Sequence, residues 1–195
     1  MLAALWLALL PLTAPPDLAA EAGITQQTAW TEFVGDELVS FSQNVTQCHR
    51  SDLPSGGSIY VKRYVYPRRF WHEFWLRPAK SAVECWAYTR LRALGIPTLD
   101  VLALGERRRF GMLQAGCIVT RGIPDTIDLV AFARTVWCRW PRARRRQVAF
   151  AIAERLLVQA RTAHAAGFFH HDLKWRNLLI DPDGDPDTLV WIDAP

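Results

Sequence analysis

The stretch HHDLKWRNLLIDPDGDPDTLVWID, residues 170–193, decides the fold that we predict for this 195-residue chain. It opens with a short polar loop, in which Asp172 and Asn177 stand five residues apart. Two apolar runs, LLI and TLVWI, flank the turn-rich segment DPDGDPD and predict a small β-hairpin. Asp193 directly follows the second run, so the hairpin would bring a second carboxylate to the loop.

The polar residues of this stretch suit phosphoryl transfer, whose catalysis consists mostly of positioning groups and neutralising charge. Asp172 can accept a proton from an attacking hydroxyl, and Lys174 can contact a transferring phosphate. Asn177 can turn back to hold a divalent cation, to which Asp193 would add a carboxylate. An Asp near an Asn is by itself more often a capped loop, so the interpretation depends on a second set of residues upstream.

Two charged residues supply that upstream set. Lys62 lies in the β-branched and aromatic run IYVKRY, which predicts a strand, and Glu84 lies on the helix predicted next. Their order resembles the lysine–glutamate pair of protein kinases, which implies that they hold the α- and β-phosphates of a nucleotide. The glycines of PSGGS, residues 54–58, form no Gly-x-Gly-x-x-Gly pattern, so we assign no phosphate-cradling residue there.

The remaining patterns predict an α+β chain. One or two strands are expected within 24–44, where residues 30–42 alternate around a turn at Gly35-Asp36, with a further strand over 58–66 and a pair within 98–122. A helix is expected over 79–96 with a stop at Gly95, and the longest helix over 142–166. The apolar face of that long helix is predicted from residues spaced four apart: Val148, Ile152, Leu156, Ala160 and His164.

These elements predict three regions along the chain. We expect an apolar N-terminal extension over residues 1–23, a β-rich lobe with one helix over 24–122, and a mostly helical lobe over 123–195. The start of the extension is similar to a signal peptide, but no Lys or Arg precedes its apolar run, and a working signal is not expected. The four cysteines form no Cys-x-x-Cys pair, which favours a reducing compartment over a disulfide framework.

The order of these residues resembles the protein-kinase catalytic machinery, with HHDLKWRN in place of the His-Arg-Asp-Leu loop. Within that superfamily the chain is most similar to the lipopolysaccharide kinases of the Kdo/WaaP type, over roughly residues 57–193. The resemblance rests on YVKRY, AVECWAYTRLRALGIPTLDVLALGERR, GFFHHDLKWRNLLI and WID. It implies a protein-kinase-like bilobal fold. Related kinases continue past the second Asp, so we expect a truncated second lobe and a long helix with a partly bare apolar side.

The resemblance also implies a function and a site. Family members use ATP and Mg²⁺ to phosphorylate Kdo or heptose of the lipopolysaccharide inner core, at the cytoplasmic face of the inner membrane. The implied roles are catalysis by Asp172 and Lys174, nucleotide binding by Lys62 and Glu84, and metal binding by Asn177 and Asp193. The expected partners are the core sugar and, peripherally, the inner membrane, and no nucleic acid is expected. The alternatives are a kinase of a protein or another small molecule, and an inactive fragment that acts as a binding module.

Two basic segments have more than one interpretation. The net charge of +4 and pI of about 9.1 suggest an anionic partner, or only a solvated basic face. The segment 63–78 interleaves arginines with aromatic residues and is either an insertion that covers the first lobe or an interfacial segment. We expect Arg63, Arg68 and Arg69, with the tryptophans 71 and 75, to dock on the membrane. The segment 139–146 opens the long helix, and its arginines favour a solvated face or an anionic partner.

Overall fold

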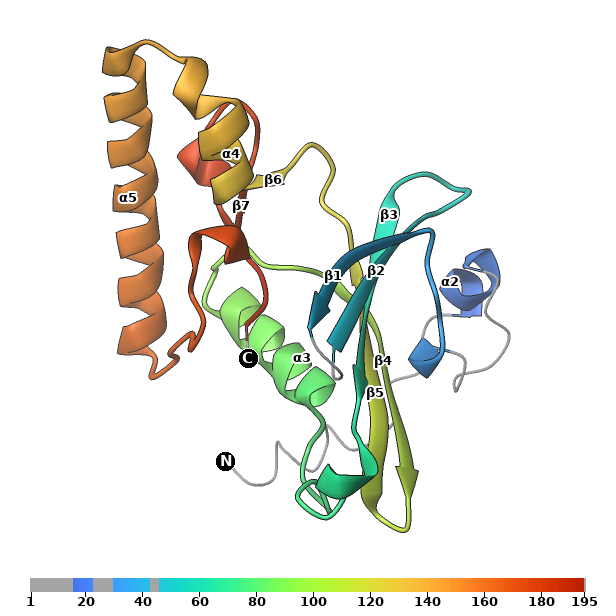
Figure 1. The fold of residues 1–195 in the computed structure, drawn as a ribbon. Coiled ribbons are helices and arrows are strands. Elements are labelled where there is room, and N and C mark those ends of the chain that lie inside the picture. The colour runs from blue at the N-terminus through green and yellow to red at the C-terminus, as the bar shows by residue number, and fades with distance from the viewer. Residues whose placement is uncertain (1–15, 23–29, 43–45, 195) are drawn as a thin grey trace. The chain divides into compact units, whose positions relative to one another are not determined.

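The computed structural model describes residues 16–22, 30–42 and 46–194, which form two compact units (Figure 1). The first unit contains the described residues up to Trp86 and the segment Asp100–Gly122. The second contains the segment Ala87–Leu99 and all described residues from Ile123 onward. Of the predicted N-terminal extension, residues 1–15 lie outside the described part of the chain. Its described part includes a short helix, α2, Pro16–Glu21.

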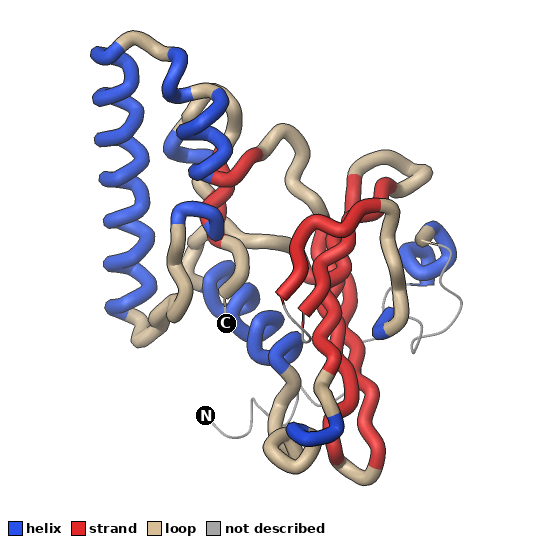
Figure 2. The backbone as a smooth tube through the Cα atoms, in the orientation of Figure 1, coloured by secondary structure: helices blue, strands red, loops and turns tan. Residues whose placement is uncertain are grey.

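A five-stranded antiparallel sheet forms the first unit, with the strand order β1-β2-β3-β5-β4 (Figure 2). Its strands are β1 Glu37–Ser42, β2 Thr46–Asp52, β3 Ser58–Val65, β4 Val101–Arg109 and β5 Met112–Arg121. Side chains alternate between the faces of β3, so Ile59 and Val61 are buried in the core with Val119 and Trp30. Lys62 therefore lies on the opposite face of β3 from this core.

Of the one or two strands predicted within 24–44, the described residues contain one, β1, and residues 24–29, 43 and 44 lie outside the described part of the chain. β3 and the pair β4 and β5 are confirmed, whereas only the second half of 30–42 forms a strand. Residues 30–32 form a helical turn instead, in which Trp30 is buried in the core. β2 was not predicted at all, because its sequence TQCHRSD is polar and carries no apolar alternation.

The glycines of PSGGS serve the turn between β2 and β3. Gly56 and Gly57 have φ values of 97° and 85°, which side chains other than hydrogen rarely allow. The Gly56 N–H donates to Leu53 O, and the Leu53 N–H donates to Gly57 O, at 2.9 and 3.0 Å. This hairpin turn accounts for both glycines without a nucleotide.

Helix α3, Lys80–Ala93, confirms the predicted helix and its stop. Gly95 has a φ of 71°, and the following Ile96 N–H returns to Leu91 O at 3.0 Å, which closes the helix end. Within α3, residues 80–86 belong to the first unit and residues 87–93 belong to the second.

The second unit combines helices with a small antiparallel sheet in the order β6-β7-β8. Its strands are β6 Ile127–Asp128, β7 Leu178–Ile180 and β8 Val190–Trp191, so the predicted hairpin is confirmed. Its α-helices are α4 Leu129–Thr135 and α5 Arg142–Ala165, and its 3₁₀ turns are η3 Trp137–Arg139, η4 Trp175–Asn177 and η5 Pro186–Thr188. Asp128 caps α4 by accepting from the backbone N–H groups of Val130 and Ala131.

The long helix α5 is confirmed, but its predicted apolar face is wrong at the C-terminal end. Ile152 is buried, whereas His164 is exposed and stacks on the exposed Phe169 ring at 4.8 Å. Residues spaced four apart drift by about 40° per step around a helix of 3.6 residues per turn, so four steps carry a residue to about the opposite side. The buried positions beyond Ile152 are instead Gln159 and Ala163.

Gln159 joins α5 to the hairpin. Its side-chain amide is buried, with Nε2 donating to Leu189 O at 3.2 Å and Oε1 accepting from Trp191 Nε1 at 2.8 Å. Both ends of the amide are therefore satisfied, as a buried polar group requires. The helical periodicity of apolar residues did not predict that Gln159 is buried.

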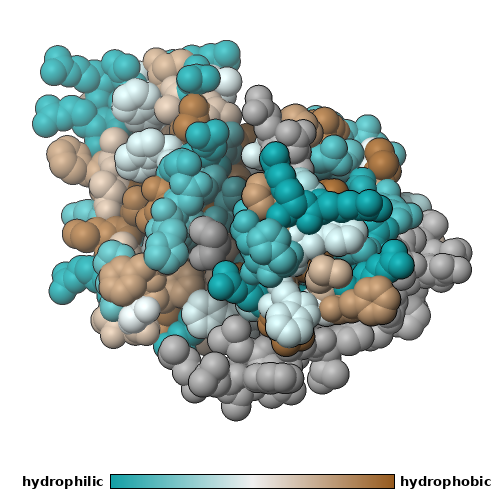
Figure 3. All heavy atoms as spheres, turned by 60° about the horizontal axis from the view of Figure 1, so that its bottom comes forward, coloured by the Kyte–Doolittle hydropathy of each residue, from teal (hydrophilic) through white to brown (hydrophobic). Residues whose placement is uncertain are grey.

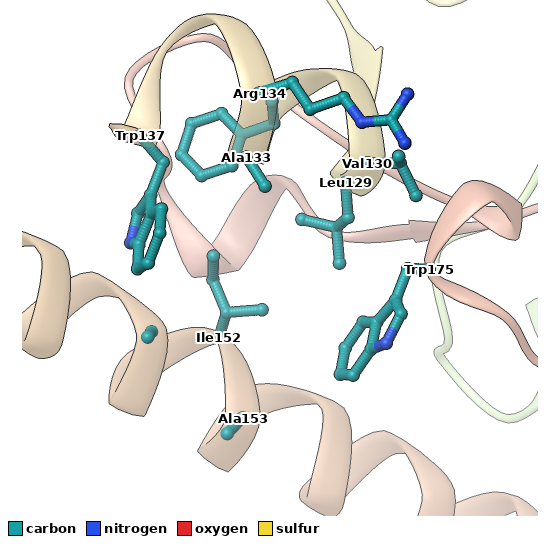
Figure 4. A pocket seen from close by; sticks show the side chains of 10 residues that line it. Leu129, Val130, Ala133, Arg134, Trp137, Ile152, Ala153 and Trp175 are labelled. Atoms are coloured by element: carbon teal, nitrogen blue, oxygen red, sulfur yellow. The ribbon is translucent and has the colours of Figure 1, made fainter. Parts of the chain in front are cut away.

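One side of α5 is apolar and open. A cavity of about 370 Å³ lies between α4 and α5, and Figure 4 shows Leu129, Ile152, Trp137 and Trp175 around it. Further along α5, Phe150, Leu157 and Val158 are exposed, which agrees with the expected bare apolar side. Among the described residues, no helix is long and apolar enough to cross a membrane.

Candidate active site

Lys62 and Glu84 form an ion pair in the first unit, as the sequence predicted. Nζ of Lys62 lies 3.1 Å from Oε2 and 3.3 Å from Oε1 of Glu84. The glutamate side chain is 6% exposed, whereas that of the lysine is 20% exposed. The carboxylate is thus the buried member of the pair, and the lysine is the more exposed one.

Tyr64 adds a third group that sequence reasoning missed. Its hydroxyl donates to Oε2 of Glu84. Tyr64 and Lys62 are two residues apart on β3 and therefore point to the same face of the sheet. This spacing is the one signal by which the sequence shows that Tyr64 belongs with Lys62.

In the second unit, His170 supports the loop between α5 and β7. The Asp172 N–H donates to Nδ1 of His170 at 3.2 Å, and Nε2 lies 3.2 Å from Ile192 O. Because Nδ1 accepts, the hydrogen of the neutral ring is on Nε2 and is donated to Ile192 O. Burial lowers the pKa of His170, which favours this neutral form. His170 thus ties the loop to the segment after β8.

Asn177 holds the same loop from its other end. Its Nδ2 donates to the backbone oxygen of Asp172 at 2.8 Å and lies 3.4 Å from the Asp172 carboxylate. The backbone oxygen of Asn177 accepts from the Ile192 N–H at 2.9 Å. Since Asp172 engages the amide nitrogen, the side-chain oxygen Oδ1 is the atom that can bind a cation.

Asp172 and Lys174 face each other within the loop, with Nζ 2.5 Å from Oδ1. The hydrogen bond from Lys174, with smaller contributions from its charge and from Asn177, holds the pKa of Asp172 below its usual value. Asp172 is therefore ionised at neutral pH. Its side chain is partly exposed, so a hydroxyl can approach it.

Asp193 follows β8 in a left-handed backbone conformation, with a φ of 58°. Its N–H donates to the hydroxyl oxygen of the buried Tyr88 at 3.1 Å, which fixes this uncommon conformation. Asp193 directly follows Ile192, whose oxygen lies 3.2 Å from Nε2 of His170, so its backbone lies beside the loop that carries Asp172. Sequence reasoning missed Tyr88, which lies on α3.

Asn177 and Asp193 carry side-chain oxygens of the kind that bind magnesium. Mg²⁺ is usually held by one or two protein oxygens together with waters and phosphates, rather than by a dedicated cage of side chains. In the described part of the chain, no three His, Cys, Asp or Glu residues cluster as such a cage. The predicted residues thus form two groups, Lys62 with Glu84 in the first unit, and Asp172, Lys174, Asn177 and Asp193 in the second.

The antiparallel sheet with its lysine–glutamate pair, and the helices that carry the Asp–Asn loop, define a protein-kinase-like fold. The chain belongs to the lipopolysaccharide kinase (Kdo/WaaP) family, whose model matches residues 58–194. The predicted fold class and family are therefore confirmed, and membership implies a phosphotransferase that uses ATP.

Comparison with solved structures supports the fold. The chain is similar to the protein in a structure described as WaaP in complex with acyl carrier protein, with a TM-score of 0.65 and 24% identity. The match covers 94% of this chain and 70% of that one. No curated protein matches the chain.

Proposed function

We propose that this protein is an ATP-dependent kinase that phosphorylates Kdo or heptose of the lipopolysaccharide inner core. Membership of the Kdo/WaaP family supports this acceptor class. The observation that carries the catalytic part is the Asn177 amide bonded to Asp172, because it leaves an ionised carboxylate and an amide oxygen on one rigid loop.

Each of the candidate residues has its own role in the proposed reaction. ATP with Mg²⁺ supplies the phosphoryl group when bound. Lys62, fixed by Glu84 and Tyr64, holds phosphate oxygens, and Asn177 with Asp193 holds the cation. Asp172 accepts the proton that the acceptor hydroxyl releases as its oxygen bonds to the γ-phosphorus, while the bond from that phosphorus to the bridging oxygen breaks and ADP leaves.

Lys174 has two partners in this scheme. It pairs with Asp172 in the structure, and a phosphate oxygen that enters the loop would compete for its ammonium. The exchange would place a positive charge on the transferring group and free the carboxylate for the acceptor. We place this reaction at the cytoplasmic face of the inner membrane, where a lipid-linked sugar acceptor is presented.

Transfer of radiolabelled γ-phosphate from ATP tests the proposal. The parent protein should label a lipopolysaccharide core that bears Kdo or heptose, and Asp172→Asn should not. Labelling of peptides alone would replace the sugar acceptor with a protein. Nucleotide binding without transfer to either acceptor would favour the alternative of an inactive binding module.

A further inference from the structure

Two segments of the first unit meet at the end of the sheet where β4 turns into β5 (Figure 1). The turn contains Phe110 and Gly111, and the other segment is the connection from β3 to α3. The Leu76 N–H donates to Gly111 O at 3.4 Å. Arg108 fastens the two segments, since its guanidinium donates to Arg77 O at 2.7 Å and to Gly111 O at 3.1 Å. These hydrogen bonds join the two segments into one ordered surface at this end of the sheet, which we call the platform.

Three bulky apolar side chains project from this platform. Trp75, Leu76 and Phe110 are 59%, 66% and 81% exposed. Leu76 and Phe110 also have φ values of 55° and 53°, a left-handed conformation that is uncommon for bulky residues. The fold thus holds apolar groups outward at a backbone cost, and such strain often marks a functional site.

Three exposed arginines lie on the same two segments as these apolar groups. The guanidiniums of Arg68, Arg69 and Arg109 lie 5.7, 4.7 and 5.4 Å from the ring centroids of Trp71, Phe70 and Phe110. These are cation–π distances, so positive charge and aromatic surface are presented together. The β3–α3 connection also contains Glu73 and Arg77, whose opposite formal charges cancel in its net charge. Figure 3, which brings this end forward, shows hydrophilic and hydrophobic side chains intermixed on its surface.

We propose that this surface, the tip surface formed by Trp75, Leu76, Phe110, Arg68, Arg69 and Arg109, docks on an anionic phospholipid bilayer. The apolar side chains enter the boundary between headgroups and acyl chains, and the arginines bind the headgroup phosphates. A soluble anionic ligand would use the arginines alone and would leave the three apolar groups in water. The proposal deepens the proposed function and rests on it, because a lipid-anchored acceptor explains why the enzyme would bind a membrane.

The structure also corrects the docking residues expected from the sequence. Arg63 is not part of the surface, because its guanidinium is half-buried and donates to Thr31 O and Phe33 O, both at 2.9 Å. Trp71 is half-buried, with Nε1 donating to Tyr66 O at 2.6 Å. Leu76, Arg109 and Phe110 take their place, and the last two lie at the end of β4 and in the turn that follows it.

The other basic segment is a weaker candidate and serves as a control. The guanidiniums of Arg144 and Arg145 lie 3.9 and 5.3 Å from the ring centroids of Trp140 and Trp137. The exposed apolar groups of α5 begin only at Phe150. The variant R142Q/R144Q/R146Q therefore removes three charges from an exposed surface outside the tip.

Sedimentation with vesicles of phosphatidylcholine and phosphatidylglycerol at 3:1, and of phosphatidylcholine alone, tests the proposal without nucleotide or acceptor. The parent should bind the anionic vesicles. R68Q/R69Q/R109Q should bind them about 100-fold more weakly in low salt, since each arginine near an anionic surface contributes about fivefold. Phe110→Ser, a change at an exposed side chain, should weaken binding about tenfold while Phe41→Ser on β1 does not.

Three results would overturn the docking role. They are equal binding by the tip triple variant and the parent, an equal loss in R142Q/R144Q/R146Q, and absence of parental binding to anionic vesicles. Thermal melting of each variant ensures that the comparison is between folded proteins. Because vesicle binding and phosphate transfer are measured separately, loss of one assignment leaves the other standing.

Discussion

Oε2 of Glu84 is shared by two donors, Nζ of Lys62 at 3.1 Å and the hydroxyl of Tyr64. The carboxylate is buried, so its position is set by α3 and by these two bonds. An ammonium held this way stays in one place before a nucleotide arrives, which reduces the ordering cost of binding.

We expect Lys62→Ala to weaken binding of Mg-ATP at least tenfold, because a charge-assisted contact to phosphate contributes about 1.5–3 kcal/mol. Tyr64→Phe should weaken binding less, since Glu84 still orients the lysine. Calorimetric titration measures both affinities. Lys80→Ala, which removes an exposed lysine on α3, is the matched control. Equal affinity of Lys62→Ala and the parent would remove the nucleotide role.

Asp172→Asn should lower the rate of phosphate transfer by roughly 10²–10⁴, the usual range for loss of a general base. The affinity for Mg-ATP should change little, because the proposed role of Asp172 is toward the acceptor. Steady-state transfer kinetics and nucleotide titration separate the two effects. Asp183→Asn, at an exposed position in the hairpin, should leave both unchanged. A rate equal to the parent's would show that Asp172 is only a loop residue.

Gln159→Leu should destabilise the protein by about 1–3 kcal/mol, because it leaves Trp191 Nε1 and Leu189 O buried without a partner. The free energy of unfolding in urea measures this loss. Gln147→Leu, at an exposed position near the start of α5, should change it by less than about 0.5 kcal/mol. Similar values for the two variants would mean that Gln159 does not anchor the hairpin.

His49 makes stability depend on pH. It is buried on β2, neither ring nitrogen has a partner among the described residues, and burial, aided by the charge of Arg63, lowers its pKa from 6.5. The unfolded chain therefore binds the proton more tightly. Stability from this residue should be full above about pH 6.5 and fall as pH drops toward the lowered pKa.

Urea unfolding at pH 5 and pH 7.5 measures that difference in stability. His49→Leu should reduce it, and the remainder should come partly from His170, whose pKa is also lowered by burial. His72→Gln, at an exposed position in the same unit, should leave the difference as in the parent. An unchanged difference in His49→Leu would contradict the assignment.

The exposed side of α5 should make purified residues 1–195 prone to aggregate, since Phe150, Leu157 and Val158 are bare. L157Q/V158Q should reduce light scattering at a given concentration without lowering the melting temperature. L38Q/V39Q, which changes two exposed apolar residues on β1, is the control. If both double variants reduce light scattering equally, the exposed side of α5 is not the surface that causes aggregation.

The sequence by itself determined the elements whose signals are local. The β-branched and aromatic run around Lys62 predicted β3, Gly95 marked the end of α3, and two apolar runs around a turn-rich segment predicted β7 and β8. The candidate residues of the loop, Asp172 and Asn177, were also found from spacing, because five residues of chain limit how far apart they can lie. The resemblance supplied the family, which the family match confirms.

Tertiary structure alone decided which side chains meet and which stay in water. Tyr64 meets Glu84 across twenty residues of sequence, and Gln159 meets Trp191 across thirty-two. Arg63 turns inward to backbone oxygens of residues 31 and 33, while Phe110 is held outward on its turn. Sequence periodicity reports the face of an element and not its partner, because partners are selected by the packing of elements that are distant along the chain.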